Sequence, residues 1–287
     1  MNRFFLSLIL LAVCGCGAPA PTEVAQPTVP ENSSAPNAIR ILAWNVESGG
    51  NFPPVIASQL ENEFSGYDIY ALSEVLPTSF QQYQEALGPT FLSIEAEMGQ
   101  DDRLQFLVDG ERFELIEWEE LNESGGYRMN DGKHRSPLMV HLMDRMTGER
   151  LKVVNNHLAR GDADFREEQA SGLREWAREQ SVATIAVGDY NFDYWFTRRE
   201  GNSGFAAMLR DNVWSWVKPA EWVDTNWDED RDHPGNDRYP DSMLDFAFVA
   251  GPAKVWDASC RVIVLPGDFP DNEDTSDHRP VELILTP

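Results

Sequence analysis

Six short polar groups recur along the chain, each at the end of an apolar segment. They are Asn45 with Glu47, Glu74, Asn155 with His157, Asp189 with Asn191, Asp245, and Asp277 with His278. Carboxylate oxygens are the ligands that hard divalent cations prefer, side-chain amides can hold phosphate oxygens, and histidine carries protons or charge near neutral pH. One such group alone means little, because Asn and Asp often cap turns. Together the six supply carboxylates for a hard cation, amide groups for phosphate oxygens and two histidines for proton or charge work.

The segments between these groups alternate between strand-like and helix-like patterns. Short apolar segments bounded by turn residues predict strands at 39–46, 67–75, 184–188, 244–249, 261–265 and 281–286. Helices are expected at 53–64, 79–87 and 165–180. Two hairpins are expected, one joining 104–109 to 113–121 across Gly110 and one joining 138–144 to 151–158 across Thr147-Gly148. This mixed α/β pattern predicts two sheets packed face to face with helices outside.

The ordered polar groups resemble the motifs of the endonuclease/exonuclease/phosphatase family. The matching residues are Trp44-Asn45, Ser73-Glu74-Val75, Asn155-x-His157-Leu158, Gly188-Asp189-x-Asn191, Leu244-Asp245 and Ser276-Asp277-His278, with Arg166-x-x-Gln169-Ala170 and Arg135-x-Pro137 in support. The family includes apurinic endonucleases, secreted deoxyribonucleases, neutral sphingomyelinases and inositol-polyphosphate phosphatases. The match covers residues 39–287 and implies one catalytic domain, a four-layer α-β-β-α sandwich of two mixed sheets.

The resemblance implies which residues hold a metal ion. Glu74 corresponds to the principal ligand of Mg²⁺ or Mn²⁺, with Ca²⁺ as a further candidate. Asn45, Glu47 and Asp277 stand where the family places further groups around the metal, often through water. Members vary at the position of Glu47, so a surface carboxylate is the alternative there. Whether one or two metal ions take part stays open.

The resemblance also implies roles in the reaction. Asp189 would orient or deprotonate the attacking water, and Asn191 would hold that water or a phosphate oxygen. His157 and His278 would contact the phosphate, and Asp245 would accept a hydrogen bond from His278 and favour its charged form. Asn45, Asn191, His157 and Arg135 are the expected substrate-binding residues. The identity of the general base stays open.

The formal net charge of −25 narrows the expected substrates. An acidic surface repels polyanions at long range, so it favours a small or lipid phosphoester, or a phosphodiester presented at a membrane, over duplex DNA. The expected enzyme is a phosphodiesterase or phosphatase, and the choice between monoester and diester stays open. A nuclease is nevertheless the strongest alternative within the same class of hydrolase. A non-catalytic surface binding protein is the alternative from another class, and it is disfavoured because every central motif position is filled.

The N-terminus has the pattern of a bacterial lipoprotein signal at residues 1–16. Arg3 precedes the apolar run 4–13, and Val13-Cys14-Gly15-Cys16 resembles a lipoprotein cleavage box, with Cys16 as the lipidated residue. A plain secretory signal is the alternative. Residues 17–38 are rich in proline and predict a flexible linker. The expected protein is a lipid-anchored, extracytoplasmic monomer of the cell envelope, in the inner or the outer membrane.

A few residues outside the motifs have their own interpretations. Cys260 is expected to be a buried filler, and His141 a core residue, while His134 and His233 match no motif. Residues 201–238 are interpreted as long functional loops around a short helix. In them, the acidic run 224–232 is either solvated or a structural Ca²⁺ site. Trp222 and Trp227 beside it either stack on a ligand or pack the loop down.

Overall fold

The computed structural model describes residues 35–132, 135–227, 241–270 and 274–287. These residues belong to one compact unit, Ser34–Pro287. The predicted signal with Cys16, most of the linker, His134, His233 and most of the acidic run 224–232 lie outside the described residues. Among the helices of the described part, none combines the length and the apolar character needed to cross a bilayer.

The first six-stranded sheet, sheet A, contains both ends of the folded unit. Its spatial order is β13 (Asp257–Val262), β14 (Val281–Thr286), β1 (Ile39–Asn45), β2 (Ile69–Val75), β4 (Arg103–Asp109) and β3 (Phe91–Glu95). Only the pair β1–β2 is parallel, and the other neighbours run antiparallel. The carboxyl ends of β1 and β2 therefore lie side by side at one edge of sheet A.

The second six-stranded sheet, sheet B, repeats this arrangement. Its order is β11 (Trp214–Trp216), β12 (Met243–Ala250), β10 (Ala183–Tyr194), β9 (Arg150–His157), β8 (Leu138–Asp144) and β5 (Phe113–Glu120). Here β9 and β10 form the parallel pair, and β8 and β9 form the antiparallel hairpin predicted across Gly148. A small two-stranded ribbon, β6 (Glu123–Ser124) with β7 (Tyr127–Arg128), stands apart from both sheets.

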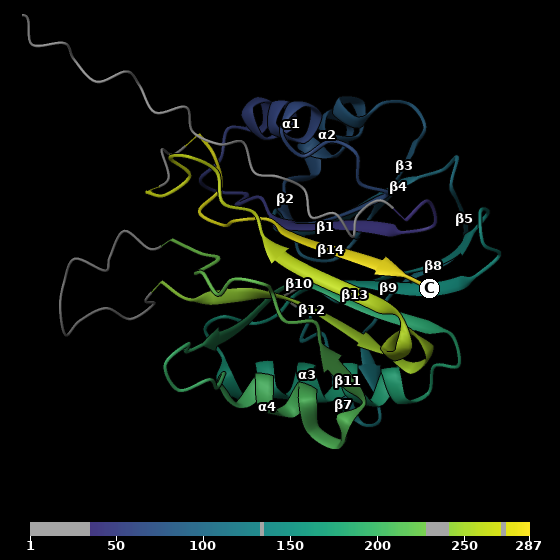
Figure 1. Ribbon diagram of the computed structural model, residues 1–287. Helices are drawn as coiled ribbons and strands as arrows, with labels where there is room; N and C mark the ends of the chain where they lie inside the picture. Colours follow the sequence, from purple (N-terminus) through teal and green to yellow (C-terminus); the bar gives the residue numbers. More distant parts are fainter. Residues whose placement is uncertain (1–34, 133–134, 228–240, 271–273) are drawn as a thin grey trace, which may run out of the picture. The chain divides into compact units, whose positions relative to one another are not determined.

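Helices cover the outer face of each sheet. α1 (Pro53–Asn62) and α2 (Phe80–Leu87) lie on sheet A, and α3 (Ala163–Arg178) and α4 (Ser203–Leu209) lie on sheet B (Figure 1). Short 3₁₀ turns occur at Pro77–Ser79, Arg210–Asn212 and Gly251–Val255. The fold is therefore the four-layer α-β-β-α sandwich that the sequence predicts.

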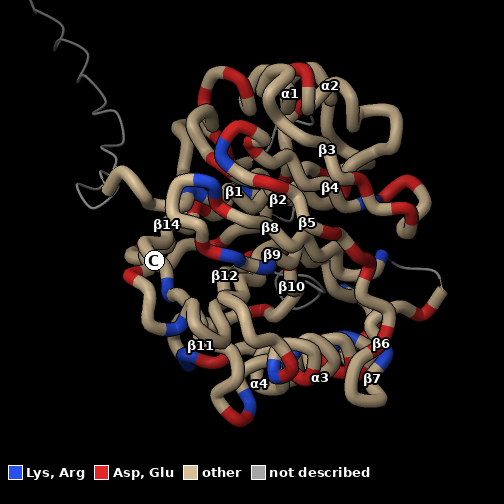
Figure 2. The backbone as a smooth tube through the Cα atoms, turned by 90° about the vertical axis from the view of Figure 1, so that its right-hand side faces the viewer, with Lys and Arg blue, Asp and Glu red and all other residues tan. Residues whose placement is uncertain are grey.

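Three apolar layers hold the four structural layers together. In β1, Ile39, Ile41 and Ala43 join the core between the sheets, while Leu42 and Trp44 join the core beneath α1 and α2. Successive side chains of a strand point to opposite faces. A strand whose apolar residues enter a core on each side is therefore covered on both faces, as β1 is. Apart from Asp144, Asp189, Asp245 and Glu282, the described acidic residues are at least partly exposed. Figure 2 shows Asp and Glu distributed over the helices, strands and loops of the folded unit.

The hairpin predicted across Gly110 is wrong. The segment 104–109 falls in β4 of sheet A, whereas the segment 113–121 falls in β5 of sheet B, so the chain passes from one sheet to the other at this point. The antiparallel partners of β4 are instead β2 and β3, and β3, in which only Ile94 is buried, is a strand that the sequence pattern does not reveal. Two further strands have different bounds: β13 ends at Val262, and β10 continues past Gly188 to Tyr194.

Arg112 links the two sheets at this crossing. Its guanidinium lies 2.9 Å from Asp68 Oδ2, just before β2, and 3.0 Å from Asp144 Oδ2, at the end of β8. It also donates to the carbonyl oxygens of Asn37 and Ala38, two residues that the sequence analysis assigns to the linker. Asp144 is fully buried. The guanidinium thus neutralises carboxylates from both sheets and secures the start of the fold.

Replacing this guanidinium is expected to be costly. Arg112→Ala leaves the buried Asp144 carboxylate without its cation, and an uncompensated buried charge costs about 3–5 kcal/mol. Denaturant unfolding should report that loss in the free energy of unfolding. Arg145→Ala is the control, because Arg145 pairs with Glu114 where both side chains are about half exposed. Similar stabilities for the two variants would contradict a role of Arg112 in joining the sheets.

Candidate active site

The predicted site residues meet where the parallel strand pairs of both sheets end. Asn45 is the last residue of β1 and lies beside β2, which carries Glu74. His157 is the last residue of β9 and lies beside Asp189 of β10. The Asn45 Nδ2 atom donates to Glu74 Oε1 at 2.9 Å and to Asp189 Oδ2 at 3.1 Å. One amide therefore joins the two sheets at the centre of the site.

A second asparagine holds the same edges together from within the core. Asn155, fully buried in β9, donates from Nδ2 to the carbonyl oxygen of Leu72 in β2 at 2.8 Å. This bond runs from sheet B to sheet A two residues before the site on each strand. We infer that Asn155 in the Asn-x-His motif fixes the spacing of the sheets, while His157 faces the reacting groups.

Both histidines approach the same carboxylate oxygen. His157 Nε2 lies 3.4 Å from Asp189 Oδ2 and His278 Nε2 lies 3.8 Å from it. All three side chains are buried. Burial alone would raise the pKa of Asp189, but the positive charges of His157 and His278 lower it below its ordinary value. Asp189 is therefore an ionised carboxylate between two imidazoles.

His278 forms a buried ion pair with Asp245, as the family resemblance implies. Its Nδ1 atom lies 2.8 Å from Asp245 Oδ2. Asp245 is the register partner of Asp189 in the adjacent strands β12 and β10, which explains why both carboxylates reach one imidazole. Burial would lower the pKa of His278, but the charges of Asp245 and Asp277 raise it well above its ordinary value. His278 is thus a cation that presents Nε2 to the site.

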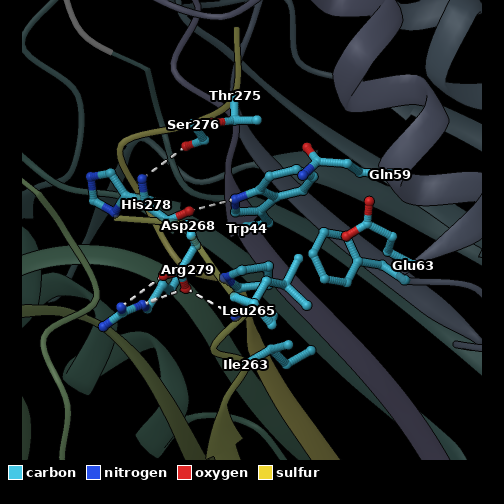
Figure 3. Close-up of a pocket in the computed structure, with 14 residues that line it drawn as sticks. Trp44, Gln59, Glu63, Ile263, Leu265, Asp268, Thr275, Ser276, His278 and Arg279 are labelled. Atoms are coloured by element: carbon cyan, nitrogen blue, oxygen red, sulfur yellow. Dashed lines mark hydrogen bonds and ion pairs between the residues drawn. The ribbon is translucent and has the colours of Figure 1, made fainter. Parts of the chain in front are cut away.

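The loop that carries Asp277 and His278 is fastened to the end of β1. Ser276 Oγ donates to the carbonyl oxygen of Asn45 at 2.6 Å and accepts from His278 N at 2.9 Å. Trp44 Nε1 donates to the carbonyl oxygen of His278 at 2.8 Å (Figure 3). A cavity of about 260 Å³ lies beside this loop and is lined among others by Trp44, Phe64, Leu265, Ser276 and His278 (Figure 3).

Three of the predicted residues have left-handed backbones. Glu47, Glu74 and Asn191 have φ values of 54°, 54° and 52°. This region is unfavourable for residues with a side chain, and such strain concentrates at functional sites. In β2 and in β10 the strand register shifts around these positions, between Leu72 and Val75 and between Asp189 and Tyr194. Because of these irregularities, the side chains of Glu74 and Asn191 do not follow the regular alternation of side chains between the two faces of a strand.

Asn191 is held beside Asp189 by its own backbone and side chain. Its N–H donates to Asp189 Oδ1 at 2.9 Å, and its Nδ2 donates to the carbonyl oxygen of Leu158 at 3.0 Å. Its Oδ1 atom is buried and has no hydrogen-bond partner among the described residues. A buried acceptor of this kind needs a donor. A water molecule can donate such a hydrogen bond, and holding a water is one of the two roles predicted for Asn191.

Glu74, Asp277 and Asn45 offer an all-oxygen set of the type that Mg²⁺ and Mn²⁺ prefer. Burial raises the pKa of Asp277 to about 6, and although the His278 cation lowers it, the Glu74 charge raises it further. The negative charge at this point is thus incompletely compensated, which fits a bound cation. Within the described residues, no three His, Cys, Asp or Glu side chains form a cluster that could hold a metal ion.

Glu47 has a bracing role in the structure. Its N–H donates to Asn45 Oδ1 and its Oε2 accepts from the N–H of Asp277, both at 3.0 Å. A Cβ atom at Gly50 would overlap its carboxylate, so a larger residue there would displace the end of the Glu47 side chain. The carboxylate predicted as the least certain metal ligand thus supports the loop that carries Asp277.

Arg135, predicted to bind phosphate, is engaged with the protein. Its Nε donates to the carbonyl oxygen of His157 at 2.9 Å, and its Nη1 lies 2.5 Å from Asp102 Oδ2. Asp102 in turn places Oδ1 3.3 Å from His157 Nδ1. His157 therefore has a carboxylate neighbour, as His278 has Asp245. Asp102 follows Gly99 in an irregular loop, where the sequence gives no signal of this role.

Thr225 and Asn226 also belong to the site and were not predicted. Thr225 Oγ1 accepts from the N–H groups of Leu244 and Asp245 at 2.8 and 3.1 Å, and Asn226 forms a backbone bridge to His278. Both side chains are fully buried. They hold the Asp245 strand and the His278 loop in register. Their signal in the sequence is weak, because they lie in a long segment without periodicity.

Three residues outside the motifs, Cys260, His141 and Trp222, lie within the described part of the chain. Cys260 is buried, and burial raises the pKa of its thiol to about 12, so it is an inert filler as expected. His141 is only partly buried and lies 3.2 Å from Glu117 rather than in the core. Trp222 packs against Tyr194 and Trp216, which supports the packing interpretation for this residue.

The four-layer sandwich is similar to the fold of solved endonuclease/exonuclease/phosphatase proteins. An endonuclease/exonuclease/phosphatase from Bacteroides vulgatus has this fold, with a TM-score of 0.66, 16% identity, and coverage of 86% of this chain and 98% of that one. The mannosyl-6-phosphatase Bt3783 of Bacteroides thetaiotaomicron VPI-5482 gives a TM-score of 0.64 at 18% identity, covering 86% and 99%. D. rerio TDP2, complexed with a single-strand DNA product, gives 0.65 at 15% identity, covering 87% and 99%. Neither a family model nor a curated protein matches the sequence.

Proposed function

We propose that the chain is a divalent-metal-dependent phosphoesterase, a hydrolase that works in the cell envelope. One observation carries the proposal: the oxygen Asp189 Oδ2 is shared by His157 Nε2, His278 Nε2 and the Asn45 amide, at 3.4, 3.8 and 3.1 Å. These groups come from both sheets and from four separate parts of the chain. Their convergence on one ionised oxygen suits a reaction in which a water loses a proton beside a negatively charged phosphate.

The residues have complementary parts in such a hydrolysis. A bond forms between the water oxygen and phosphorus while the ester P–O bond breaks, so the water must lose a proton and the alcohol must gain one. Asp189 accepts or orients the proton of the water, and Asn191 Oδ1 holds that water. The His278 cation and His157 stabilise the charge on the phosphate oxygens.

The metal site belongs to the same proposal. Glu74, Asn45 and Asp277 would hold Mg²⁺ or Mn²⁺, with Ca²⁺ as a further candidate, and the ion would neutralise charge on the phosphate. Glu74 Oε1 is 2.9 Å from the Asn45 amide that also contacts Asp189, so the metal-binding and water-binding groups are adjacent. This adjacency supports a metal-assisted reaction.

The test is a substrate panel with the full chain purified in detergent. We expect hydrolysis of a small phosphate ester in Mg²⁺ or Mn²⁺, with sphingomyelin, inositol phosphates and plasmid DNA defining the class. The net charge of −25 supports a small or lipid substrate over duplex DNA. Cleavage of plasmid DNA alone would favour the nuclease alternative. Binding without hydrolysis of any ester would favour a non-catalytic binding protein.

Removal of the metal is expected to abolish hydrolysis. The predicted ligands are all oxygen atoms, and without a cation the carboxylates of Glu74 and Asp277 would repel a phosphate. Exhaustive EDTA treatment followed by gel filtration should therefore eliminate turnover, and added Mg²⁺ or Mn²⁺ should restore it. Full turnover after this treatment would contradict metal dependence.

The envelope location rests on the N-terminal sequence. If Cys16 carries the lipid, Cys16→Ser should move the protein from the membrane fraction to the soluble fraction. Cys14→Ser is the matched control, since it changes the neighbouring cysteine and should leave the protein in the membrane fraction. Equal fractionation of both variants would mean that Cys16 is not the anchor.

A further inference from the structure

Arg279 directly follows His278 and forms a bidentate ion pair. Its Nε atom donates to Asp268 Oδ2 at 2.8 Å, and its Nη2 atom donates to Asp268 Oδ1 at 2.9 Å (Figure 3). The side chains of Arg279 and Asp268 are only 15% and 18% exposed. Two parallel hydrogen bonds between a guanidinium and a carboxylate fix the orientation of the pair as well as its distance. The direction of the Arg279 side chain is therefore set by Asp268.

Asp268 is itself held in a turn that follows β13. Its Oδ2 atom also accepts from the N–H of Leu265 at 3.0 Å, and its own N–H donates to the carbonyl oxygen of Leu265 at 3.2 Å. The next residue, Phe269, packs its ring against the guanidinium, with Arg279 Cζ 4.0 Å from the ring centre. A guanidinium over an aromatic face is attracted to it. Asp268 thus binds the edge of the guanidinium, and Phe269 covers its face.

A third set of contacts connects Arg279 to the segment that contains Thr225. Arg279 Nη1 donates to the carbonyl oxygen of Asp224 at 3.1 Å, and the N–H of Arg279 donates to the carbonyl oxygen of Thr225 at 2.7 Å. Thr225 Oγ1 in turn accepts from the N–H of Asp245 at 3.1 Å. Arg279 is therefore adjacent to His278 in the chain. Through Thr225 it is also connected to Asp245, the ion-pair partner of His278.

The guanidinium of Arg279 is engaged away from the reacting groups. In the described part of the chain, its hydrogen bonds go to Asp268 and to the carbonyl oxygen of Asp224. His278, one residue earlier, has its Nε2 atom 3.8 Å from Asp189 Oδ2. A shift of the loop would change this distance. Any effect of Arg279 on the reaction therefore has to pass through the position of His278.

We propose that Arg279 is a positioning residue, and that its ion pair with Asp268 holds the loop so that His278 Nε2 stays beside Asp189 and the phosphate. This inference rests on the proposed function and adds two residues that lie outside the predicted site. Neither residue touches the substrate. Loss of the ion pair should therefore lower turnover in a protein that is still folded.

The first measurement is the steady-state kinetics of Arg279→Gln, made with the full chain and the best substrate of the panel. We expect kcat to fall by about 10- to 100-fold, because misplacing a catalytic group by about 1 Å can cost about 10²-fold. KM should change much less than kcat, since the loss is in the transition state. Arg279→Lys keeps the charge but lacks the planar donor pair, so it should recover part of the kcat.

Asp268→Asn separates position from charge. It weakens the same ion pair, but it removes a negative charge, whereas Arg279→Gln removes a positive one. If the pair acts by positioning His278, both variants lower kcat. If the guanidinium instead attracts the phosphate by its charge, the two variants change kcat in opposite directions. Opposite changes would overturn the proposal.

The His278→Ala variant shows whether the effect passes through His278. When His278 is absent, adding Arg279→Gln should change the remaining kcat by less than about twofold, because groups that act as one unit are not additive. A loss as large as in the wild-type background would contradict the proposal.

Arg261→Gln is the matched control for a loss of stability. Arg261 forms a similar bidentate pair with Glu282, with its Nε atom at 2.5 Å and its Nη2 atom at 3.2 Å, on the adjacent strands β13 and β14. Glu282 is buried, so this variant should lower the melting temperature and leave kcat unchanged. If Arg279→Gln behaves in the same way, its role is only structural and the proposal is wrong.

A spectroscopic measurement keeps the test independent of the proposed function. If the wild type hydrolyses no member of the panel, the proposed function fails, and the position of His278 is then followed by NMR of the full chain labelled at its histidine rings. Comparison with His278→Ala assigns the His278 signals. They should shift in Arg279→Gln and in Asp268→Asn and stay unchanged in Arg261→Gln. Unchanged His278 signals in Arg279→Gln would overturn the proposal, whether or not the protein is active.

Discussion

Asp189→Asn is expected to lower turnover by about 10³-fold or more while the protein still folds, because both a proton acceptor and an electrostatic group are lost. The substitution keeps the shape of the side chain but removes its charge. It leaves His157 and His278 without the anion that both of them face at 3.4 and 3.8 Å. Steady-state kinetics with the best substrate of the panel, alongside thermal unfolding, would measure the effect.

Asp193→Asn is the matched control for this prediction. Asp193 lies four residues further along β10, also has a left-handed backbone, and accepts a hydrogen bond from Asn202 Nδ2 at 3.0 Å. Its carboxylate has no place in the proposed reaction, so the control should keep turnover within a few-fold of the wild type. A variant Asp189→Asn that retains more than a tenth of the wild-type turnover would show that Asp189 is not the reacting carboxylate.

The pair Asp245 and His278 is expected to act as one unit. Asp245→Asn removes the charge that keeps His278 cationic, and turnover should fall by about 10²-fold, the scale of a lost electrostatic or acid–base group. His278→Ala should cost at least as much. Because the ion pair is 2.8 Å long and buried, the double variant should be barely slower than His278→Ala alone.

The double-variant comparison separates coupling from a structural role. If the losses in log turnover simply add, with equal melting temperatures, then Asp245 does not act through His278. If Asp245→Asn instead lowers the melting temperature and leaves turnover intact, its contribution is confined to the strand pair β10–β12. Either result would contradict the coupling that the geometry indicates.

The sequence predicts the groups at strand ends well, because those positions follow from local pattern. Asn45, His157 and Asp189 each follow a short apolar run, and parallel strands bring their carboxyl ends together. The pairing of Asp245 with His278 follows from the family resemblance, and the structure agrees. For the same reason the four-layer order was predictable, since apolar strands covered on both faces require helices outside.

What the sequence does not predict depends on contacts between distant segments. Asp102 reaches His157 from a loop without periodicity, and nothing near Asp102 marks it. The residues around Gly110 have the composition of a hairpin turn, but the strands on either side of it pair with distant segments, β5 with β8 and β4 with β2 and β3. Arg135 matches a family motif and was predicted to bind phosphate. In the structure its guanidinium contacts the carbonyl oxygen of His157 and the carboxylate of Asp102.

The reacting groups are divided between two separately hydrogen-bonded sheets. The layer of apolar side chains between the sheets therefore sets the distance between these groups. Asn45 and Glu74 are carried by one sheet, and His157 and Asp189 by the other. Side chains such as Ile41 and Val153 fill the gap between them. Protein cores are packed as densely as crystals, so a lost methyl group changes the gap or leaves a void. The volumes of these residues therefore determine how precisely the reacting groups are spaced. None of these residues belongs to the site or contacts a substrate.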